Sequence, residues 1–174
     1  FSSELVLTNW STSKKSLRFA FVDQDSQSQD SSSSFVVELN AREQRIISSL
    51  GRWLERGRVS EMASAHRPHM GSLFATVKGG DVDGIFLGAR ISRRDQWGRY
   101  SLFYAAVPEG MASTASTWLY GLQQNAETRT HLALLNTGDT DSAPDVFAVE
   151  LFDGETGLKV NTIEGITLNA RSWM

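Results

Sequence analysis

The 174-residue sequence contains no cysteine, and this absence removes three kinds of chemistry from consideration. A chain without thiols forms no disulfide bonds, has no cysteine-ligated zinc and uses no cysteine nucleophile. The absence leaves the cellular compartment open. Serine and threonine are abundant and lysine is scarce, a bias associated with secreted bacterial β proteins.

The chain also lacks an excess of positive charge and a long apolar run. Its net charge is −3 and its pI is about 5.6, so there is no electrostatic argument for nucleic-acid binding. The apolar runs are far shorter than a membrane span, which predicts no transmembrane segment. No targeting segment is visible and the first residue is Phe1, not Met. We therefore expect an extracytoplasmic protein, secreted or at the cell surface, from which a leader has been removed.

Familiar catalytic motifs are missing as well. The sequence has no Gly-x-Ser-x-Gly, no phosphate-binding glycine loop and no His-Glu-x-x-His. Glu38, Glu150 and Asp153 could supply the carboxyl pair of a glycoside hydrolase, but any β protein offers such pairs. We therefore expect no enzymatic activity, no cofactor and no metal, although a cation held by Asp81 and Asp83 stays open.

What the sequence does contain is alternation of apolar and polar residues. Period-two alternation places apolar side chains on one face of a sheet, and turn signals separate the apolar stretches every ~8–12 residues. The expected strands are 4–9, 17–23, 35–39, 72–78, 84–92, 99–107, 146–152, 158–160 and 163–168. This pattern predicts a mainly β protein built as an antiparallel β-sandwich, in which residues 72–107 form a meander.

One segment reads differently and predicts a single amphipathic helix over 41–56. Asn40 can cap it, and Glu43 stands where a capping box requires an acid. Apolar residues follow at helical spacing: Ile46, Ile47, Leu50, Trp53 and Leu54. We expect this stripe to cover one end of the β core; the alternative is a partner-binding face.

Three segments near the start of the chain have counterparts near its end. The pairs are 5–9 with 132–136, 17–23 with 147–153, and 37–42 with 166–171. The third pair shares Leu-Asn-Ala-Arg, in register with the other two matches. The sequence therefore predicts an internal duplication with a period of about 129 residues. Asn9 and Asn136 end the first strand of each copy and are interpreted as turn residues.

The duplication allows two domain organisations. We expect one compact unit, 1–174, in which the repeated three-strand pieces 4–42 and 131–171 pack around the 72–107 meander. In the alternative, 1–110 is a first module and 118–174 is a second, partial module.

The second copy resembles a known family. The run from Leu132 to Asp141 (LALLNTGDTD), followed by 146–153 and Gly154, is similar to strand-turn-strand repeats of bacterial surface modules, in particular the cell-adhesion-related domains. The resemblance implies an immunoglobulin-like sandwich without catalytic residues. It implies a role in cell adhesion or structural spacing, with a surface protein or a polysaccharide as the partner.

Exposed aromatic residues define the alternative function, a carbohydrate-binding module. Trp10, Trp97 and Trp118 lie in or beside predicted loops, where flat rings could stack on sugars. The competing interpretation is that these rings fill the ends of the sandwich, since tryptophan contributes a large apolar surface to a core.

Overall fold

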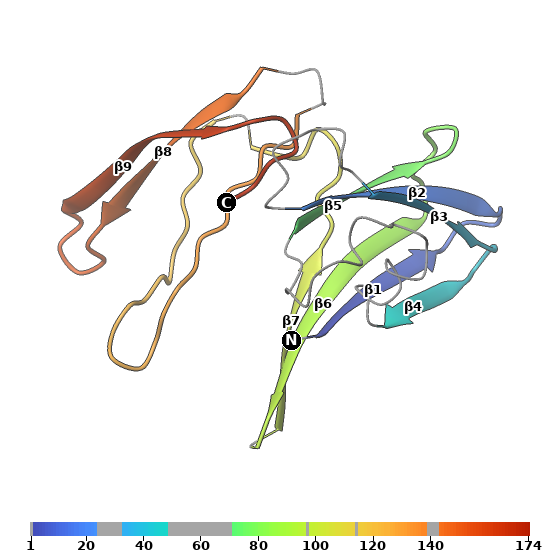
Figure 1. The fold of residues 1–174 in the computed structure, drawn as a ribbon, viewed down its shortest axis with the longest axis horizontal. Coiled ribbons are helices and arrows are strands. Elements are labelled where there is room, and N and C mark those ends of the chain that lie inside the picture. Colours follow the sequence, from blue (N-terminus) through green and yellow to red (C-terminus); the bar gives the residue numbers. More distant parts are fainter. Residues whose placement is uncertain (1, 24–32, 49–70, 97, 114, 139–142) are drawn as a thin grey trace. The chain divides into compact units, whose positions relative to one another are not determined.

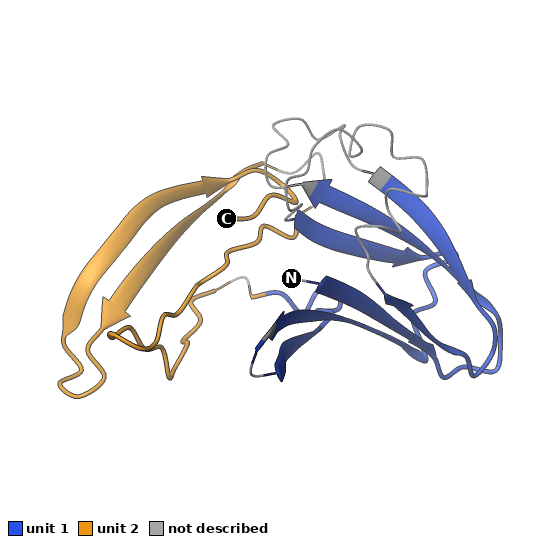
Figure 2. Cartoon of the chain, turned by 60° about the horizontal axis from the view of Figure 1, so that its bottom comes forward, with its two compact units in different colours: residues 1–23, 30–112 blue, residues 24–29, 113–174 orange. Residues whose placement is uncertain are grey.

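A computed structural model describes residues 2–23, 33–48, 71–96, 98–113, 115–138 and 143–174 (Figure 1). The chain divides into two compact units. The first unit comprises 1–23 and 30–112, and the second comprises 24–29 and 113–174 (Figure 2). The boundary between the units near the middle of the chain falls between residues 112 and 113. Whether the two repeated pieces share one core stays a prediction.

The described residues form nine strands and no helix. The strands are β1 (Ser2–Asn9), β2 (Lys15–Asp23), β3 (Ser33–Leu39), β4 (Gln44–Ser48), β5 (Gly71–Val77), β6 (Ile85–Asp95), β7 (Gly98–Ala105), β8 (Asp145–Phe152) and β9 (Lys159–Leu168). Every strand pair is antiparallel. The prediction of a mainly β, antiparallel protein is confirmed.

The first unit contains two sheets that contribute to one core. Their strand orders are β4-β1-β6-β7 and β3-β2-β5 (Figure 1). Buried apolar residues of both sheets form one cluster: Leu5, Leu7, Leu17, Phe19, Phe21, Val37, Leu39 and Ile47. Two antiparallel sheets around a shared apolar interior are consistent with a β-sandwich.

Strand β2 shows how alternation builds this core. Leu17 and Phe19 are buried, while Arg18 between them is exposed, as period-two geometry requires. The ring of Phe19 stacks on that of Phe35 in β3, with 4.9 Å between ring centroids. The central strand therefore anchors the three-stranded sheet to the core.

The helix predicted over 41–56 is wrong where the structure describes it. Residues Gln44–Ser48 form β4, which pairs with β1; residues 49–56 lie outside the described range. Arg42 has φ 60°, a left-handed conformation that a right-handed helix does not accommodate. Ile47 then faces the core and Ile46 faces outward, so β-branched residues in alternation favour the strand.

The predicted meander over 72–107 also needs correction. Only β6 and β7 are paired neighbours, because β5 pairs with β2 in the other sheet. Likewise β1 and β2, which follow one another in the sequence, belong to different sheets. The alternating pattern identifies the inward face of each strand, but it does not specify which sheet the strand joins.

The second unit contains the hairpin of β8 and β9 and a short bridge between Leu135 and Trp173. A tight turn joins the strands, in which the Asp153 N–H donates to the Leu158 carbonyl at 2.8 Å. The pairing shifts by one residue between Phe147 and Val149. Gly165, at φ 70°, lies in the opposite strand at this point, where glycine readily adopts the conformation of a bulge.

Candidate functional site

The amide side chain of Asn9 holds the end of β1 in place. Asn9 is fully buried, and its Nδ2 donates to the carbonyls of Ser13 at 2.8 Å and Asn40 at 2.9 Å, with a longer contact to Leu39 at 3.4 Å. Its Oδ1 accepts from the backbone N–H of Ser11 at 3.0 Å. This bond to the residue two positions on agrees with the interpretation of Asn9 as a turn residue. One side chain thus joins three segments of backbone.

Asn136 makes matching bonds in the second unit. It is also buried, and its Nδ2 donates to the Leu168 carbonyl at 3.0 Å. Its Oδ1 accepts from the N–H of Gly138, two residues on, at 2.8 Å. Leu168 occupies in the second copy the position of Leu39 in the first, so the two asparagines bind matching backbone positions.

The turn opposite each asparagine is matched as well. The N–H of Asn9 donates to Glu43 at 2.8 Å, and that of Asn136 to Ser172 at 3.0 Å. Within each turn lies an arginine with positive φ: Arg42 at 60° and Arg171 at 63°. These are the non-glycine residues with positive φ among the described parts of the chain, and no sequence pattern predicted their conformation.

The pairing register of the two hairpins agrees too. Lys15 opposes Leu39 in the first unit and Asp145 opposes Leu168 in the second. The bridge between Leu135 and Trp173 takes the place of a residue pair of β1 and β4. The correspondence thus covers the asparagine, the turn and the first residue pairs of each hairpin, up to the register shift after Phe147.

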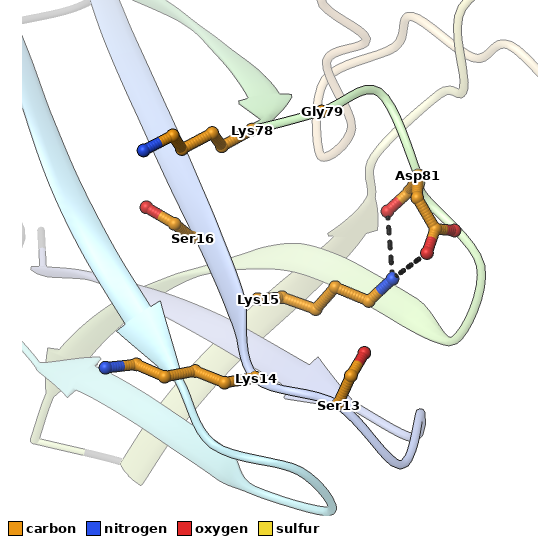
Figure 3. Close-up of a pocket in the computed structure, with 7 residues that line it drawn as sticks. All are labelled: Ser13, Lys14, Lys15, Ser16, Lys78, Gly79 and Asp81. Atoms are coloured by element: carbon orange, nitrogen blue, oxygen red, sulfur yellow. Dashed lines mark hydrogen bonds and ion pairs between the residues drawn. The ribbon is translucent and has the colours of Figure 1, made fainter.

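A shallow hollow of about 260 Å³ lies beside this region in the first unit (Figure 3). Its lining residues are Ser13, Lys14, Lys15, Ser16, Lys78, Gly79 and Asp81. The Lys15 side chain is buried and pairs with Asp81, whereas Lys14 turns the other way (Figure 3). Lys14 pairs with Glu38. Two of the three ammonium groups are thus neutralised, which argues against an anion site.

The possible cation site at Asp81 and Asp83 has another use in the structure. Asp81 Oδ2 accepts from Lys15, and Asp81 Oδ1 accepts from the N–H of Asp83 at 3.1 Å. Both carboxylate oxygens are therefore engaged, one of them by a cation already present in the chain. These contacts explain the aspartate in the turn without a bound metal.

The ion pair makes a testable prediction about the pKa of Asp81. Hydrogen bonds from Lys15 and from the Asp83 backbone hold this pKa below its ordinary value. The pair therefore stabilises the fold above the unfolded pKa, and its contribution is lost as the pH falls through the folded pKa. We expect Lys15→Met to raise the pKa of Asp81 toward the ordinary value in a carboxyl-carbon NMR titration. Lys14→Met, which leaves the Asp81 contacts intact, is the matched control; an unchanged pKa in Lys15→Met contradicts the assignment.

Two of the three predicted tryptophans lie within the described residues, one in each unit. Trp10 follows the Asn9 turn in the first unit and is 61% exposed, and Trp97 lies outside the described residues. Trp118, in the second unit, is also 61% exposed and stacks on Tyr120, with ring centroids 6.5 Å apart and planes at 20°. Phe152 lies 5.2 Å from Trp118, centroid to centroid, so the second unit carries an aromatic cluster that the sequence indicated only in part.

The carboxylates considered for acid–base chemistry are occupied elsewhere. Glu38 pairs with Lys14 and Glu150 pairs with Lys159 at 3.0 Å. Asp153 accepts from the backbone N–H and the hydroxyl of Thr156, each at 2.7 Å, and these bonds lower its pKa. All three groups therefore have structural partners that explain their positions.

These features define a mainly β protein of antiparallel sheets, with a buried asparagine turn in each unit. No family model, curated protein or solved structure matches the chain. Across the ranges that the structure covers, no helix has the length and apolar character needed to cross a membrane. The function is therefore inferred from the geometry of the molecule itself.

Proposed function

We propose that the chain is a non-catalytic, extracytoplasmic module of the bacterial cell surface, built by internal duplication of an immunoglobulin-like β unit, and that it serves in cell adhesion or structural spacing. The observation that carries this proposal is the matched asparagine turn in the two units. Two buried asparagines, two left-handed arginines and two hairpins that begin in the same register are most simply explained by a repeated unit. The period of about 129 residues follows from the matched Leu39 and Leu168.

Repetition favours a mechanical or adhesive role over catalysis. Repeated β units present similar surfaces along a chain, and many cell-surface proteins are built from sandwich domains. The hollow of the first unit is shallow and its lysines are largely paired, which suits a structural surface. The partner in this proposal is a surface protein or a polysaccharide.

Adhesion is tested directly with coated beads. Beads carrying the intact chain should be retained under flow on intact bacterial cells or on at least one immobilised polysaccharide, several-fold more than beads coated with albumin. The same preparation should leave glycoside, ester and peptide substrates uncleaved. Retention equal to that of albumin on every surface, or turnover of a substrate, contradicts the proposal.

The aromatic cluster of the second unit supports a second candidate, carbohydrate binding. Tyr120 is 83% exposed beside the stacked Trp118, and flat exposed rings are what a sugar ring stacks on. In this case an oligosaccharide should shift the tryptophan fluorescence of the wild type, and Trp118→Ala should abolish the shift. Trp10→Ala, which removes an equally exposed ring in the first unit, is the control. A shift that persists in Trp118→Ala rules this cluster out.

A further inference from the structure

The hairpin of β6 and β7 concentrates positive charge in a protein that is acidic as a whole. Residues 85–105 contain four arginines, no lysine and one aspartate, a net charge of +3, whereas the whole chain carries −3. A segment of opposite sign to the rest of the chain attracts anions that the remaining surface repels. The pairing of the two strands determines how its arginines face one another.

Two of these arginines, Arg94 and Arg99, form a directly opposed pair. The strand register joins them one step from the end of the hairpin, where Asp95 opposes Gly98. Directly opposed residues of an antiparallel pair lie on the same face, with Cβ atoms about 4.5–5.5 Å apart, and like charges in this arrangement are destabilising. Both arginines are exposed, and neither has an ion-pair partner among the described residues.

A third arginine on the same face shows what such a group binds. Arg90 shares a face with Arg94, since alternate residues of a strand lie on one side of the sheet. Its Nη1 donates to the carboxylate of Glu4 in β1 at 3.2 Å. Arg90 therefore has a carboxylate from within the chain, whereas the opposed pair presents two guanidinium groups without one in the described parts.

This face lies on the side of the sheet opposite to the core. Leu87 packs against the core cluster of the first unit, and Arg90, three positions further along β6, therefore lies on the other side. Between Arg90 and Arg94 the register places Ser92 opposite Ser101. Ser101 is exposed, so a hydroxyl stands next to the opposed arginines.

The chemistry of these groups favours a carboxylated sugar polymer as the ligand. Guanidinium groups bind planar carboxylates through paired hydrogen bonds, and a serine hydroxyl both donates to and accepts from sugar hydroxyls. A nucleic acid fits less well, because its dense phosphate charge would be repelled by a protein whose net charge is −3.

We propose that Arg94 and Arg99 bind the carboxylates of an acidic polysaccharide on the outward face of the β6–β7 hairpin. A carboxylate placed between the two guanidinium groups accepts hydrogen bonds from both and offsets their mutual repulsion. The inference deepens the proposed function and rests on it, because it names the chemical class of the polysaccharide partner. The site belongs to the first unit and shares no residue with the aromatic cluster of the second unit.

The inference is tested by adding an oligogalacturonate, which carries one carboxylate on each sugar, to the intact chain. The side-chain Nε–H signals of Arg94 and Arg99 should shift in NMR spectra, and that of Arg129 in the second unit should not. The methyl-esterified oligosaccharide, which keeps the sugars and lacks the charge, should shift none of them. Absence of shifts at both hairpin arginines, or equal shifts with the ester, overturns the inference.

Two double variants of equal net charge isolate the opposed pair. Arg94→Gln with Arg99→Gln should weaken binding of a labelled oligogalacturonate by about tenfold or more in fluorescence anisotropy. Arg18→Gln with Arg129→Gln removes the same charge from exposed positions elsewhere and should bind as the wild type does. Equal affinity of the two double variants overturns the inference.

Arg99→Glu separates loss of binding from loss of the fold. The new carboxylate lies directly opposite Arg94, and an opposite-charge pair at such a position stabilises a hairpin. The variant should therefore have a higher melting temperature than the wild type and should no longer bind the oligogalacturonate. Wild-type affinity in Arg99→Glu contradicts the proposed site.

Competing ligands and a competing site are distinguished in the same assay. Equal or tighter binding of poly-glutamate or of single-stranded DNA would identify an acidic protein or a nucleic acid as the occupant and overturn the choice of a polysaccharide. Binding of oligogalacturonate that Trp118→Ala abolishes, and that the hairpin double variant retains, would assign the ligand to the aromatic cluster and overturn the inference as well.

The bead experiment separates this inference from the proposed function. Failure of oligogalacturonate to bind, with coated beads still retained on a surface, refutes the arginine site and leaves the adhesive function standing. Binding of oligogalacturonate at the hairpin without retention of beads on any surface does the reverse.

Discussion

Replacing Asn9 with alanine is expected to lower the free energy of unfolding of the first unit by about 3 kcal/mol. The change removes the donor to the Ser13 and Asn40 carbonyls and the acceptor for the Ser11 N–H. These groups are held where water has little access, because Asn9 is 0% exposed. Urea denaturation, followed by NMR signals of first-unit residues, measures the loss.

Two variants show that the hydrogen bonds cause this loss. Asn136→Ala is the counterpart in the second unit, where the side chain hydrogen-bonds to Leu168 and Gly138, and it should leave first-unit signals unchanged. Asn9→Asp keeps an acceptor but places a carboxylate against two carbonyl oxygens, so it should be less stable near neutral pH than at acid pH. A stability of Asn9→Ala within ~0.5 kcal/mol of the wild type, the usual range for surface changes, contradicts the structural role.

The strands and the asparagine turns could be predicted because their determinants are local. Alternating apolar residues such as Leu17 and Phe19 identify an inward face in any sheet. An asparagine at the end of a strand binds the backbone two residues on through its own side chain, and both Asn9 and Asn136 do so. These inferences need no knowledge of the rest of the fold.

The helix could not be rejected from the sequence because Asn40 and Glu43 do interact as a helix cap predicts, although the chain then continues as strand β4. The Asn40 N–H donates to Glu43 Oε2 at 2.7 Å, which is one half of a capping box. The left-handed Arg42 then sends the chain into β4, where Ile47 is buried against the core. Tertiary pairing with β1 decided the outcome, and local propensity does not contain that information.

The pairing partners of the strands and of the lysines were beyond local reasoning for a similar reason. Strand β5 joins β2 although β6 is nearer in sequence, and Lys15 meets Asp81 across 66 positions. The equivalence of the hairpins, by contrast, was indicated by the shared Leu-Asn-Ala-Arg. In both units the leucine of this motif is buried, and its arginine adopts a positive φ in the turn.

Truncation of Phe19 to alanine is expected to destabilise the first unit by about 3–5 kcal/mol. The side chain is 1% exposed and stacks on Phe35 at 4.9 Å between centroids, so its removal loses both transferred apolar surface and ring contact. A cavity in the middle of the central strand cannot be closed without moving β3 or β5. Chemical denaturation of the intact chain, read from first-unit NMR signals, gives the change.

The control for this prediction also tests how differently the two units use the same strand position. Val36→Ala, on the outward face of β3 where the side chain is 58% exposed, should cost little. Val149→Ala alters the position in β8 that matches Phe19, where the side chain is only half-buried, and should cost far less than Phe19→Ala. A cost for Val149→Ala equal to that of Phe19→Ala contradicts this difference between the two units.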